Sequence, residues 1–380
     1  MLYVGIDEAG YGPLLGPLCV GCCVLRLDAW REGDPSPDVW KMLKSAVSRE
    51  QPKSKRGADR IAVNDSKKLK GPNSLKTRHP LTHLERGVLA FAQCMASENT
   101  GDDDSASEPG AALDTDDALF RRLGVRLDDP VSRWYACEPV RLPLSTTADH
   151  LRLLQVQLAS ACEAASVRVL ELRAHAMTET VFNQRLREAR TAPDAVPQDD
   201  AGGWGGGEPL SAGQRSKAAV SFSVVAGFLR RVWKSGASLV GAPGAEGAAI
   251  VPRIVVDRQG GRAAYAPLLN RAFPDALVTT IGESPTKSSY ELRGIGAAEG
   301  RAVRVSFQTQ AEDAHFPVAL ASMTAKLVRE LAMARFNRYW CSRIAELKPT
   351  AGYALDGERW LNDVRAHVSP QELVALRRIA

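Results

Sequence analysis

Hydrophobic and polar positions along the chain follow two alternating periods. Short apolar runs predict strands at residues 2–7, 18–27, 167–173, 250–257, 276–281 and 301–308. Apolar residues spaced by three or four positions predict helices at residues 82–95, 150–164, 178–190, 216–233 and 317–347. Strands that alternate with helices in this way indicate an α/β domain.

Three segments interrupt this pattern. Residues 98–117 contain eight acidic residues and no basic one, which predicts a disordered or loosely ordered insertion. Residues 191–214 are rich in Gly and Pro and predict a flexible linker, and residues 235–247 predict a shorter loop.

Composition excludes several classes of protein. The 380 residues are 44% hydrophobic and 24% charged, as in a soluble globular protein. The longest uncharged stretch, residues 9–25, is broken by Pro13 and Pro17 and is too short to span a membrane. Because acidic residues precede the first basic residue, Arg26, we expect no signal peptide and a cytoplasmic location.

The cysteines suggest core residues rather than a disulfide framework or a metal site. Seven cysteines at irregular spacing favour reduced thiols. Cys19, Cys22 and Cys23 have a metal-like spacing, but they lie in an apolar run that lacks a second pair of ligands. We therefore interpret them as small buried residues.

Basic residues are concentrated in one segment. The net charge is only +5, but residues 53–78 contain nine basic residues and two acidic ones. Such a segment can dock a phosphate backbone, and a solvated surface loop is the alternative. Within it, Asp65, Ser66 and Lys67 suit a helix N-cap that holds a phosphate oxygen, although a simple cap is the competing interpretation.

Acidic residues end two of the predicted strands. Asp7 and Glu8 close the first strand, and Gly10 and Gly12 permit the bend that would let both carboxylates serve one metal site. Asp257 closes a later apolar strand before a glycine turn, where α/β folds present active-site groups. Solvated strand-end acids and a turn-capping Asp are the alternatives.

The predicted helix at 317–347 carries a polar row beside its apolar face. Ser322, Lys326 and Glu330 step by four residues. The expected buried face next to them consists of Leu320, Met323, Leu327, Leu331 and Ala334. Lys before Glu is the weaker order for an ion pair within a helix, so helix stabilisation does not account for the row, and a solvated helix face is the alternative.

Taken in chain order, these elements resemble the type 2 ribonuclease H family. The family's acid-acid-Ala-Gly-Arg-Gly block is similar to residues 7–12, and its Asp-Ser-Lys-Lys-Leu element is similar to residues 65–69. Its strand-ending Asp is matched by Asp257, and its Ala-Ser-x-x-Ala-Lys helix by residues 321–326. A C-terminal Gly-Tyr followed by a helix is matched at Tyr353.

The resemblance implies an α/β ribonuclease H-like fold, with a mixed central sheet flanked by helices, a helical C-terminal extension and long insertions. Because the elements of one site are spread along the chain, we expect a single catalytic domain at residues 1–347 with the extension at 348–380 packed on it. The insertions are expected near residues 29–62, 97–133, 191–214 and 235–249.

The resemblance also implies an activity: cleavage of the RNA strand of RNA–DNA hybrids or of ribonucleotide-containing duplexes, by a monomer, leaving 5′-phosphate and 3′-hydroxyl ends. Two Mg²⁺ or Mn²⁺ ions would be held by the catalytic carboxylates of Asp7, Glu8, Asp257 and Glu330. Contacts to the nucleic acid would come from Gly10, Tyr11, Gly12, Ser66, Lys67, Ser322, Lys326 and Tyr353.

Two residues depart from the family's pattern. Tyr11 replaces the Arg that helps the family to read a ribose 2′-hydroxyl, which leaves cleavage at single embedded ribonucleotides open. Glu330 replaces an Asp and is one methylene longer. Three hypotheses therefore stand: a ribonuclease H acting on hybrids, a nuclease of the same fold with another substrate, and a nucleic-acid-binding protein with attenuated catalysis.

Overall fold

The chain is represented by a computed structural model, which describes residues 1–31, 33–51, 60–72, 77–95, 112–191, 217–240, 251–258 and 262–379. Most of the acidic segment expected at 98–117, the linker at 192–214 and most of the loop expected at 235–247 lie outside the described residues.

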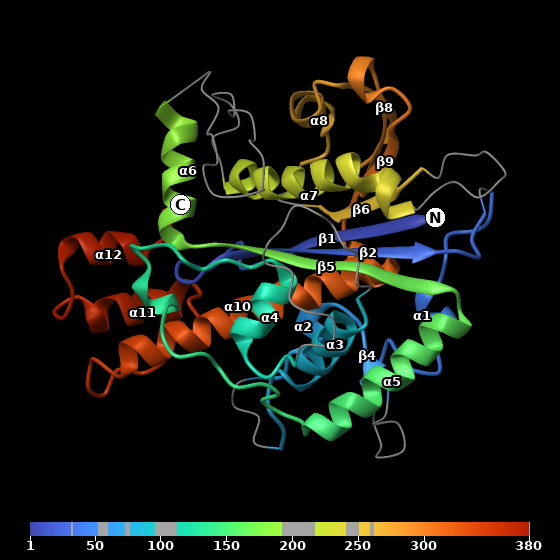
Figure 1. Ribbon diagram of the computed structural model, residues 1–380. Helices are drawn as coiled ribbons and strands as arrows, with labels where there is room; N and C mark the ends of the chain where they lie inside the picture. The colour runs from blue at the N-terminus through green and yellow to red at the C-terminus, as the bar shows by residue number, and fades with distance from the viewer. Residues whose placement is uncertain are drawn as a thin grey trace.

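A seven-stranded mixed sheet forms the centre of the molecule (Figure 1). Its order is β5 (Val167–Met177), β2 (Leu18–Leu27), β1 (Leu2–Ala9), β6 (Arg253–Asp257), β9 (Ala302–Gln308), β8 (Lys287–Gly294) and β7 (Ala276–Glu283). β1 pairs in parallel with β6, and β6 with β9, whereas all other neighbours are antiparallel. This confirms the expected α/β class with a mixed central sheet.

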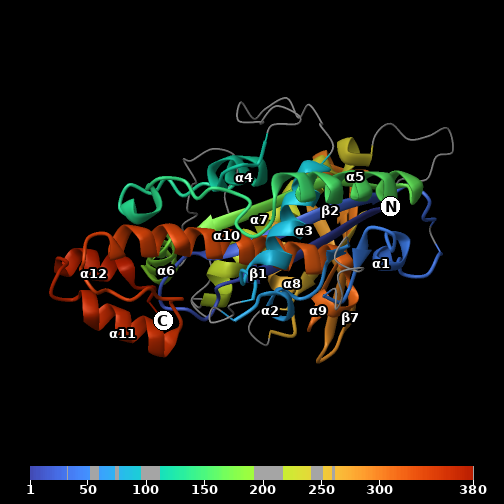
Figure 2. The same ribbon diagram turned by 90° about the horizontal axis from the view of Figure 1, so that it is seen from below.

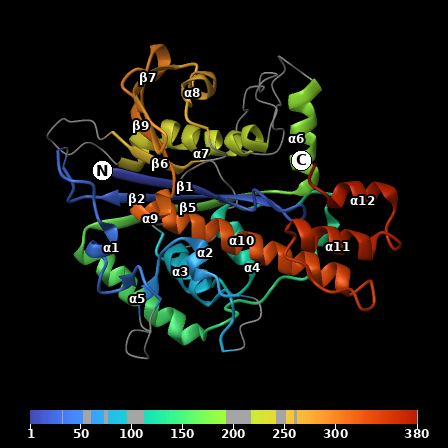
Figure 3. The same ribbon diagram turned by 180° about the vertical axis from the view of Figure 1, so that it is seen from behind.

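Helices cover both faces of the sheet (Figures 1 and 3). One face carries α7 (Lys217–Val240) and α8 (Ala266–Ala272), and the other carries α3 (Thr82–Gln93), α5 (Ala148–Ala164) and α10 (Phe316–Cys341). Alternate residues of β1 enter different clusters: Val4 and Ile6 pack towards α7, whereas Tyr3 and Ala9 pack towards α3 and α10. The core therefore consists of two layers separated by the sheet.

Smaller elements complete the description. They are α1 (Val39–Met42), β3 (Val47–Ser48), β4 (Ile61–Ala62), α2 (Ser66–Leu69), α4 (Asp116–Leu123), η2 (Arg133–Tyr135), α6 (Glu179–Thr191), η4 (Gly296–Ala298), α9 (Ala311–Ala314), α11 (Ala354–Val364) and α12 (Pro370–Leu376). β3 and β4 form a separate parallel pair.

Several boundaries differ from the sequence-based expectation. β5 continues to Met177 instead of ending at 173, because it pairs with β2 as far as Leu18. α7 continues to Val240, so residues 235–240, which were expected in a loop, are helical. α10 ends at Cys341 rather than at 347. β8 was not predicted, since its buried positions mix Ser with Tyr and Leu and weaken the apolar pattern.

Helix α10 lies directly on the backbones of β1 and β2. A Cβ atom at Gly5 would lie 2.1 Å from the carbonyl carbon of Pro317, and one at Gly21 would lie 2.2 Å from the carbonyl oxygen of Ala321. These two strand glycines therefore allow the helix to approach more closely than a side chain would permit.

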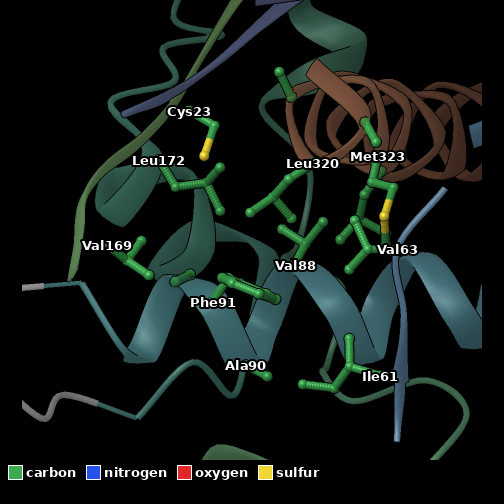
Figure 4. Packing of buried hydrophobic residues seen from close by; sticks show 14 of the residues in the cluster. Cys23, Ile61, Val63, Val88, Ala90, Phe91, Val169, Leu172, Leu320 and Met323 are labelled. Carbon is green, nitrogen blue, oxygen red and sulfur yellow. The ribbon is translucent and has the colours of Figure 1, made fainter. Parts of the chain in front are cut away.

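Helix α10 is buried on more than the one face that its sequence suggests. Leu320, Met323, Leu327 and Leu331 are fully buried as expected, whereas Ala334 is exposed. Ser322 and Lys326, from the polar row, are buried as well. Figure 4 shows residues of α3 and β5, among them Val88, Phe91, Val169 and Leu172, around Leu320 and Met323.

The C-terminal helices pack on the second half of α10 (Figure 2). The ring of Trp360 in α11 lies 4.9 Å from that of Phe336 and 5.9 Å from that of Trp340, measured between centroids. Aromatic contacts at these distances add to the stabilisation from burial.

The end of the expected disordered acidic segment is an ordered helix. Asp116 is fully buried and accepts hydrogen bonds from Nε and Nη2 of Arg335 at 2.7 and 2.5 Å. Thr115 caps the N-terminus of α4, which begins at Asp116. The prediction of disorder was wrong here because it read the acids as a solvated run, whereas one of them pairs with a buried arginine of α10.

The three cysteines of β2 are core residues, as expected. Cys19, Cys22 and Cys23 have exposed fractions of 0–2%, and burial raises the pKa of the Cys19 thiol to about 12. Among the described helices, none is both long enough and apolar enough to cross a membrane.

We predict that Gly21→Ala lowers the free energy of unfolding by about 3 kcal/mol or more, because the new methyl group meets backbone atoms of α10 that cannot rotate away. Urea unfolding of the purified chain measures this. Gly282→Ala is the matched control, since nothing in the described part of the chain lies within 4 Å of its Cβ position. Equal stability of the two variants would contradict the close approach.

Candidate active site

The site is built on two neighbouring parallel strands, β1 and β6, that carry aspartates at equivalent positions near their carboxyl ends. Ile6 of β1 is in register with Val256 of β6, so the next residues, Asp7 and Asp257, occupy equivalent positions. Adjacent strands lie about 4.8 Å apart. Both aspartates follow residues of the α7 face, so their side chains project to the face covered by α10.

Glu312 brings a third carboxylate that the sequence analysis missed. It lies in α9, directly after β9, and its exposed fraction is 8%. The backbone N–H of Ala311 donates a 2.9 Å hydrogen bond to Oδ1 of Asp257, which fixes α9 against the end of β6. The position of Glu312 in the sequence could have indicated it, because it follows β9, which pairs in parallel with β6, the strand that ends in Asp257.

Burial and mutual repulsion disfavour ionisation in this cluster. Burial, followed by the charge of Glu8, raises the pKa of Asp7 well above its usual range. Burial, and then the charge of Asp7, raises the pKa of Asp257 to about 8, with Glu312 adding to the effect. Asp7 and Asp257, whose ionisation is opposed by burial and by neighbouring negative charge, mark a place where a cation would be stabilising.

Glu8 lies beside this cluster but on the other side of the strand. β1 stays paired with β2 through Ala9, so it neither bends nor ends after Asp7 as one shared site would require. Alternation then directs Glu8 away from the α10 face. Its backbone N–H donates a 2.7 Å hydrogen bond to Oδ1 of Asp7, and its charge acts on both Asp7 and Tyr11.

The structure brings the two serine motifs together at Asp7. The Ser322 hydroxyl lies near enough to Asp7 to lower the pKa of that carboxyl group against the effect of burial, and it donates a buried 3.0 Å hydrogen bond to the Ser66 hydroxyl. Asp65 caps α2 by accepting from the N–H of Lys67, so the simple cap does form. Residues far apart in the sequence thus meet around one carboxylate.

Lys67 points its charge towards the cluster. Its side chain is exposed, and although partial burial opposes the change, the charges of Asp65, Asp7 and Glu312 raise its pKa. A protonated amine beside buried acids is suited to hold a phosphate oxygen.

Glu330 does not join the cluster. It lies eight residues after Ser322 on the same helix, which is about 12 Å along the axis. Its oxygens instead lie 2.9 Å from Nζ of Lys326 and 3.9 Å from Nζ of Lys70. The resemblance to the family implied Glu330 as a ligand by its position in the motif, but the distance along the helix is too long for Glu330 to share one metal site with the residues around Asp7.

Lys326 connects this row to the C-terminal segment. Its Nζ lies 3.4 Å from the hydroxyl of Tyr353, whose ring is about half exposed. The guanidinium of Arg329 lies 5.4 Å from the centroid of the same ring. Tyr353 therefore borders a positively charged part of α10.

The loop after β1 has a shape that depends on glycine. Gly10 has a φ of +87° and Gly16 a φ of +86°, which side chains rarely adopt. Gly12 is exposed, and no atom of the described residues lies within 4 Å of its Cβ position. Tyr11, between these glycines, is half-buried against the α7 layer.

The carboxylates of this cluster have the right chemistry for a hard divalent cation, but their present arrangement does not form a metal site. As placed, no three His, Cys, Asp or Glu side chains of the described residues could together hold a metal ion. The available donors are carboxylate oxygens, and no described group donates a hydrogen bond to the buried Oε2 of Glu312. Mg²⁺ and Mn²⁺ prefer such oxygens. Asp7, Asp257 and Glu312 therefore offer donor atoms of the right kind, but their side chains would have to move before the three could hold one ion.

Comparisons with known proteins add little to this geometry. No family model and no curated protein matches the chain. The chain is similar to a solved structure of the PCNA:RNase HII complex from Archaeoglobus fulgidus, at 12% identity and a TM-score of 0.36, over 100% of this chain and 94% of that one. A likeness this remote establishes neither fold nor function.

The raised pKa values predict that the protein loses stability as pH rises. Because the folded state of Asp257 holds its proton up to about pH 8 and the unfolded state only to about pH 4, the free energy of unfolding falls between these values. Asp257→Asn should therefore raise that free energy by about 1–3 kcal/mol at pH 8 and change it little at pH 4. Urea unfolding in EDTA across this range measures it.

Asp313→Asn is the control for this prediction. Asp313 neighbours Glu312 in α9 but is exposed, and it pairs with Lys68. Its loss should leave the pH dependence of unfolding close to that of the wild type. The same slope in wild type and Asp257→Asn would show that Asp257 does not titrate in this way.

Proposed function

We propose that the protein is a metal-dependent endoribonuclease of the ribonuclease H type, which cleaves the RNA strand of RNA–DNA hybrids. The observation that carries this proposal is that Asp7 and Asp257 occupy equivalent positions on two parallel strands, with Glu312 near enough for its charge to act on both carboxyl groups. Ser66 and Ser322 meet beside Asp7, and this meeting of two motifs from distant segments supports the same reading.

The carboxylates alone would repel a phosphodiester, so a nucleic-acid substrate requires cations between them. Two Mg²⁺ or Mn²⁺ ions would supply activation of the attacking water and stabilisation of the leaving 3′-oxygen, giving 5′-phosphate and 3′-hydroxyl ends. Asp7, Asp257 and Glu312 would hold them, whereas Glu8, whose side chain is directed to the other side of β1, would act on them through its charge. We assign Glu330 to the neutralisation of Lys326 and Lys70 instead.

Several side chains would position the nucleic acid. Lys67 is exposed and close enough to the acids for their charges to keep it protonated, so it can bind a backbone phosphate beside the cations. Lys326 and Tyr353 would contact the backbone further along α10. These contacts carry charge and shape but read no base, as suits an enzyme that acts on hybrids of any sequence.

The loop at residues 10–16, called the glycine loop below, would contact the ribose of the RNA strand. At Gly12 the open Cβ position lets a ribose approach the backbone. Tyr11 can stack on that sugar or donate a hydrogen bond, but it cannot make the bidentate contact of a guanidinium. We therefore propose hybrids, and not single embedded ribonucleotides, as the preferred substrate.

We predict that Asp7→Asn, Asp257→Asn and Glu312→Gln each lower kcat/KM on a labelled RNA–DNA hybrid by about 100-fold or more, since each removes a charged ligand. Circular dichroism should show an intact fold in all three. The assay includes a duplex with one ribonucleotide and plain DNA, each with Mg²⁺ and then Mn²⁺.

Glu330→Gln is the matched control for this experiment. It makes the same change of Glu to Gln outside the carboxylate cluster and should retain cleavage within about tenfold. Loss of cleavage in Glu330→Gln together with retention in Glu312→Gln would reverse the assignment of the ligands. Hybrid binding without cleavage by the wild type would indicate the attenuated nucleic-acid-binding protein.

Cation binding should be visible without activity. At pH 8, excess Mg²⁺ or Mn²⁺ should raise the free energy of unfolding of the wild type by about 2–3 kcal/mol, as mass action gives at 100 times Kd. Asp257→Asn and Glu312→Gln should lose most of this gain. Thermal unfolding with and without the metal measures it, and an equal gain in wild type and both variants would place the metal elsewhere.

A further inference from the structure

The loop at residues 10–16 owes its shape to contacts from other parts of the chain. It contains no helix or strand, and two of its glycines have positive φ. The carbonyl of Gly352 accepts hydrogen bonds from the N–H groups of Leu14 and Leu15 at 2.8 and 3.2 Å. Oε1 of the buried Glu179 accepts another from the N–H of Gly16 at 2.8 Å. Each of these contacts comes from a residue beyond position 170, so the conformation of the loop depends on distant parts of the chain.

The last residues of the chain add the contact that reaches the glycine segment itself. The backbone N–H of Arg378 donates to the carbonyl of Leu14 at 2.9 Å. Nη2 of Arg378 donates to the carbonyl of Gly10 at 2.6 Å and to that of Pro13. One arginine thus bridges three carbonyls of the loop.

The end of the chain is itself fastened to α6. The side chain of Asn183 donates to the carbonyl of Arg377 at 2.7 Å and accepts from the N–H of Ile379 at 2.8 Å. The guanidinium of Arg378 also lies 5.3 Å from the ring centroid of Phe182. Residues 377–379 therefore form a strap with a fixed path between α6 and the loop.

The burial of the Arg378 guanidinium costs free energy, because the charged group loses its contact with water. Its exposed fraction is 2%, and among the described residues it forms no ion pair. No described group accepts from its Nε or Nη1. Burial, and then the charge of Arg329, lowers its pKa to about 10. The buried Glu179 is near enough for its charge to favour the protonated guanidinium, but no carboxylate of the described residues lies within ion-pair distance of Arg378. A guanidinium desolvated in this way, whose side-chain hydrogen bonds all go to one loop, is poorly suited to a purely stabilising role.

We propose that this C-terminal strap holds the glycine loop in its substrate-binding conformation, with Arg378 as the positioning residue. The proposal rests on the proposed function for the meaning of that conformation. Arg378 acts through Gly10 and Pro13 and would not touch the substrate itself. Loss of its contacts should release the loop and weaken substrate binding, while the carboxylate cluster, held by β1, β6 and α9, keeps its geometry.

The test compares the full-length wild type with Arg378→Gln, Arg378→Lys, Asn183→Ala and the control Arg365→Gln. Arg365 is an exposed arginine at the end of α11, in the same C-terminal region. Hydrogen–deuterium exchange is followed in residues 10–16, with β2 as an internal reference. Steady-state cleavage of an RNA–DNA hybrid gives KM and kcat separately.

In Arg378→Gln we expect about tenfold faster exchange in the loop and no change in β2, the loss of one charge-assisted contact being worth about that factor. KM should rise about tenfold with kcat within about threefold. Arg378→Lys should fall between wild type and Arg378→Gln, because an ammonium keeps the charge but lacks the planar fork. Arg365→Gln should match the wild type.

Unchanged loop exchange in a folded Arg378→Gln would overturn the proposal, as would equal acceleration in the loop and β2. If Arg378→Gln does not fold, the proposal is tested with Arg378→Lys and Asn183→Ala. Loop exchange at the wild-type rate in both of these variants would then overturn the proposal. Because exchange needs no activity, failure of the wild type to cleave would refute the proposed function and leave the strap to be decided by exchange.

Discussion

The close contact of α10 with β1 and β2 is the constraint on which the rest of the structure depends. At Gly5 and Gly21 the helix backbone occupies the space where strand side chains would stand. The helix therefore sits too close to the sheet to have a solvated face in its first turns, which is why even Ser322 and Lys326 are buried. The same approach shapes the candidate site, because Ala321 contacts Gly21, the strand partner of Asp7, and the next residue, Ser322, then lies near enough to lower the pKa of the Asp7 carboxyl group.

A tightly packed core is what allows acids to be held in this place. Asp7 and Asp257 have raised pKa values chiefly because burial removes water from their carboxyl groups. Such a cluster destabilises the folded state at neutral pH, and the surrounding apolar layers must offset that cost. A cation would relieve the repulsion, so the features that weaken the free protein are the ones that would bind metal and substrate.

The sequence predicted what depends on local pattern and missed what depends on distant partners. Asp7 and Asp257 were found because an acid that ends an apolar strand is visible in the pattern, and parallel pairing does the rest. Glu312 was missed because α9 has four residues, too few to show a helical period. Glu330 was assigned to the site because its position matches an acid of the family that the chain resembles, and the sequence alone does not show that it lies about two turns of the helix from Ser322. Asp116 was predicted to be disordered because the sequence around it gives no sign of its ion-pair partner, Arg335, which lies far away along the chain.

The glycine loop shows how far such distant partners can reach. Asp7 is placed by strands that pair within the sheet, but the loop that follows it is held by Arg378, whose contact with Gly10 joins residues 368 positions apart. Closing a loop of that length is entropically unfavourable unless the intervening chain has already folded. The carboxylate cluster can therefore form with the core, whereas the glycine loop is completed only when the C-terminal helices have docked on α10. On the proposed function, the residues that would hold the cations are therefore placed by β1, β6 and α9, whereas the loop that would contact the substrate is placed by the C-terminal residues.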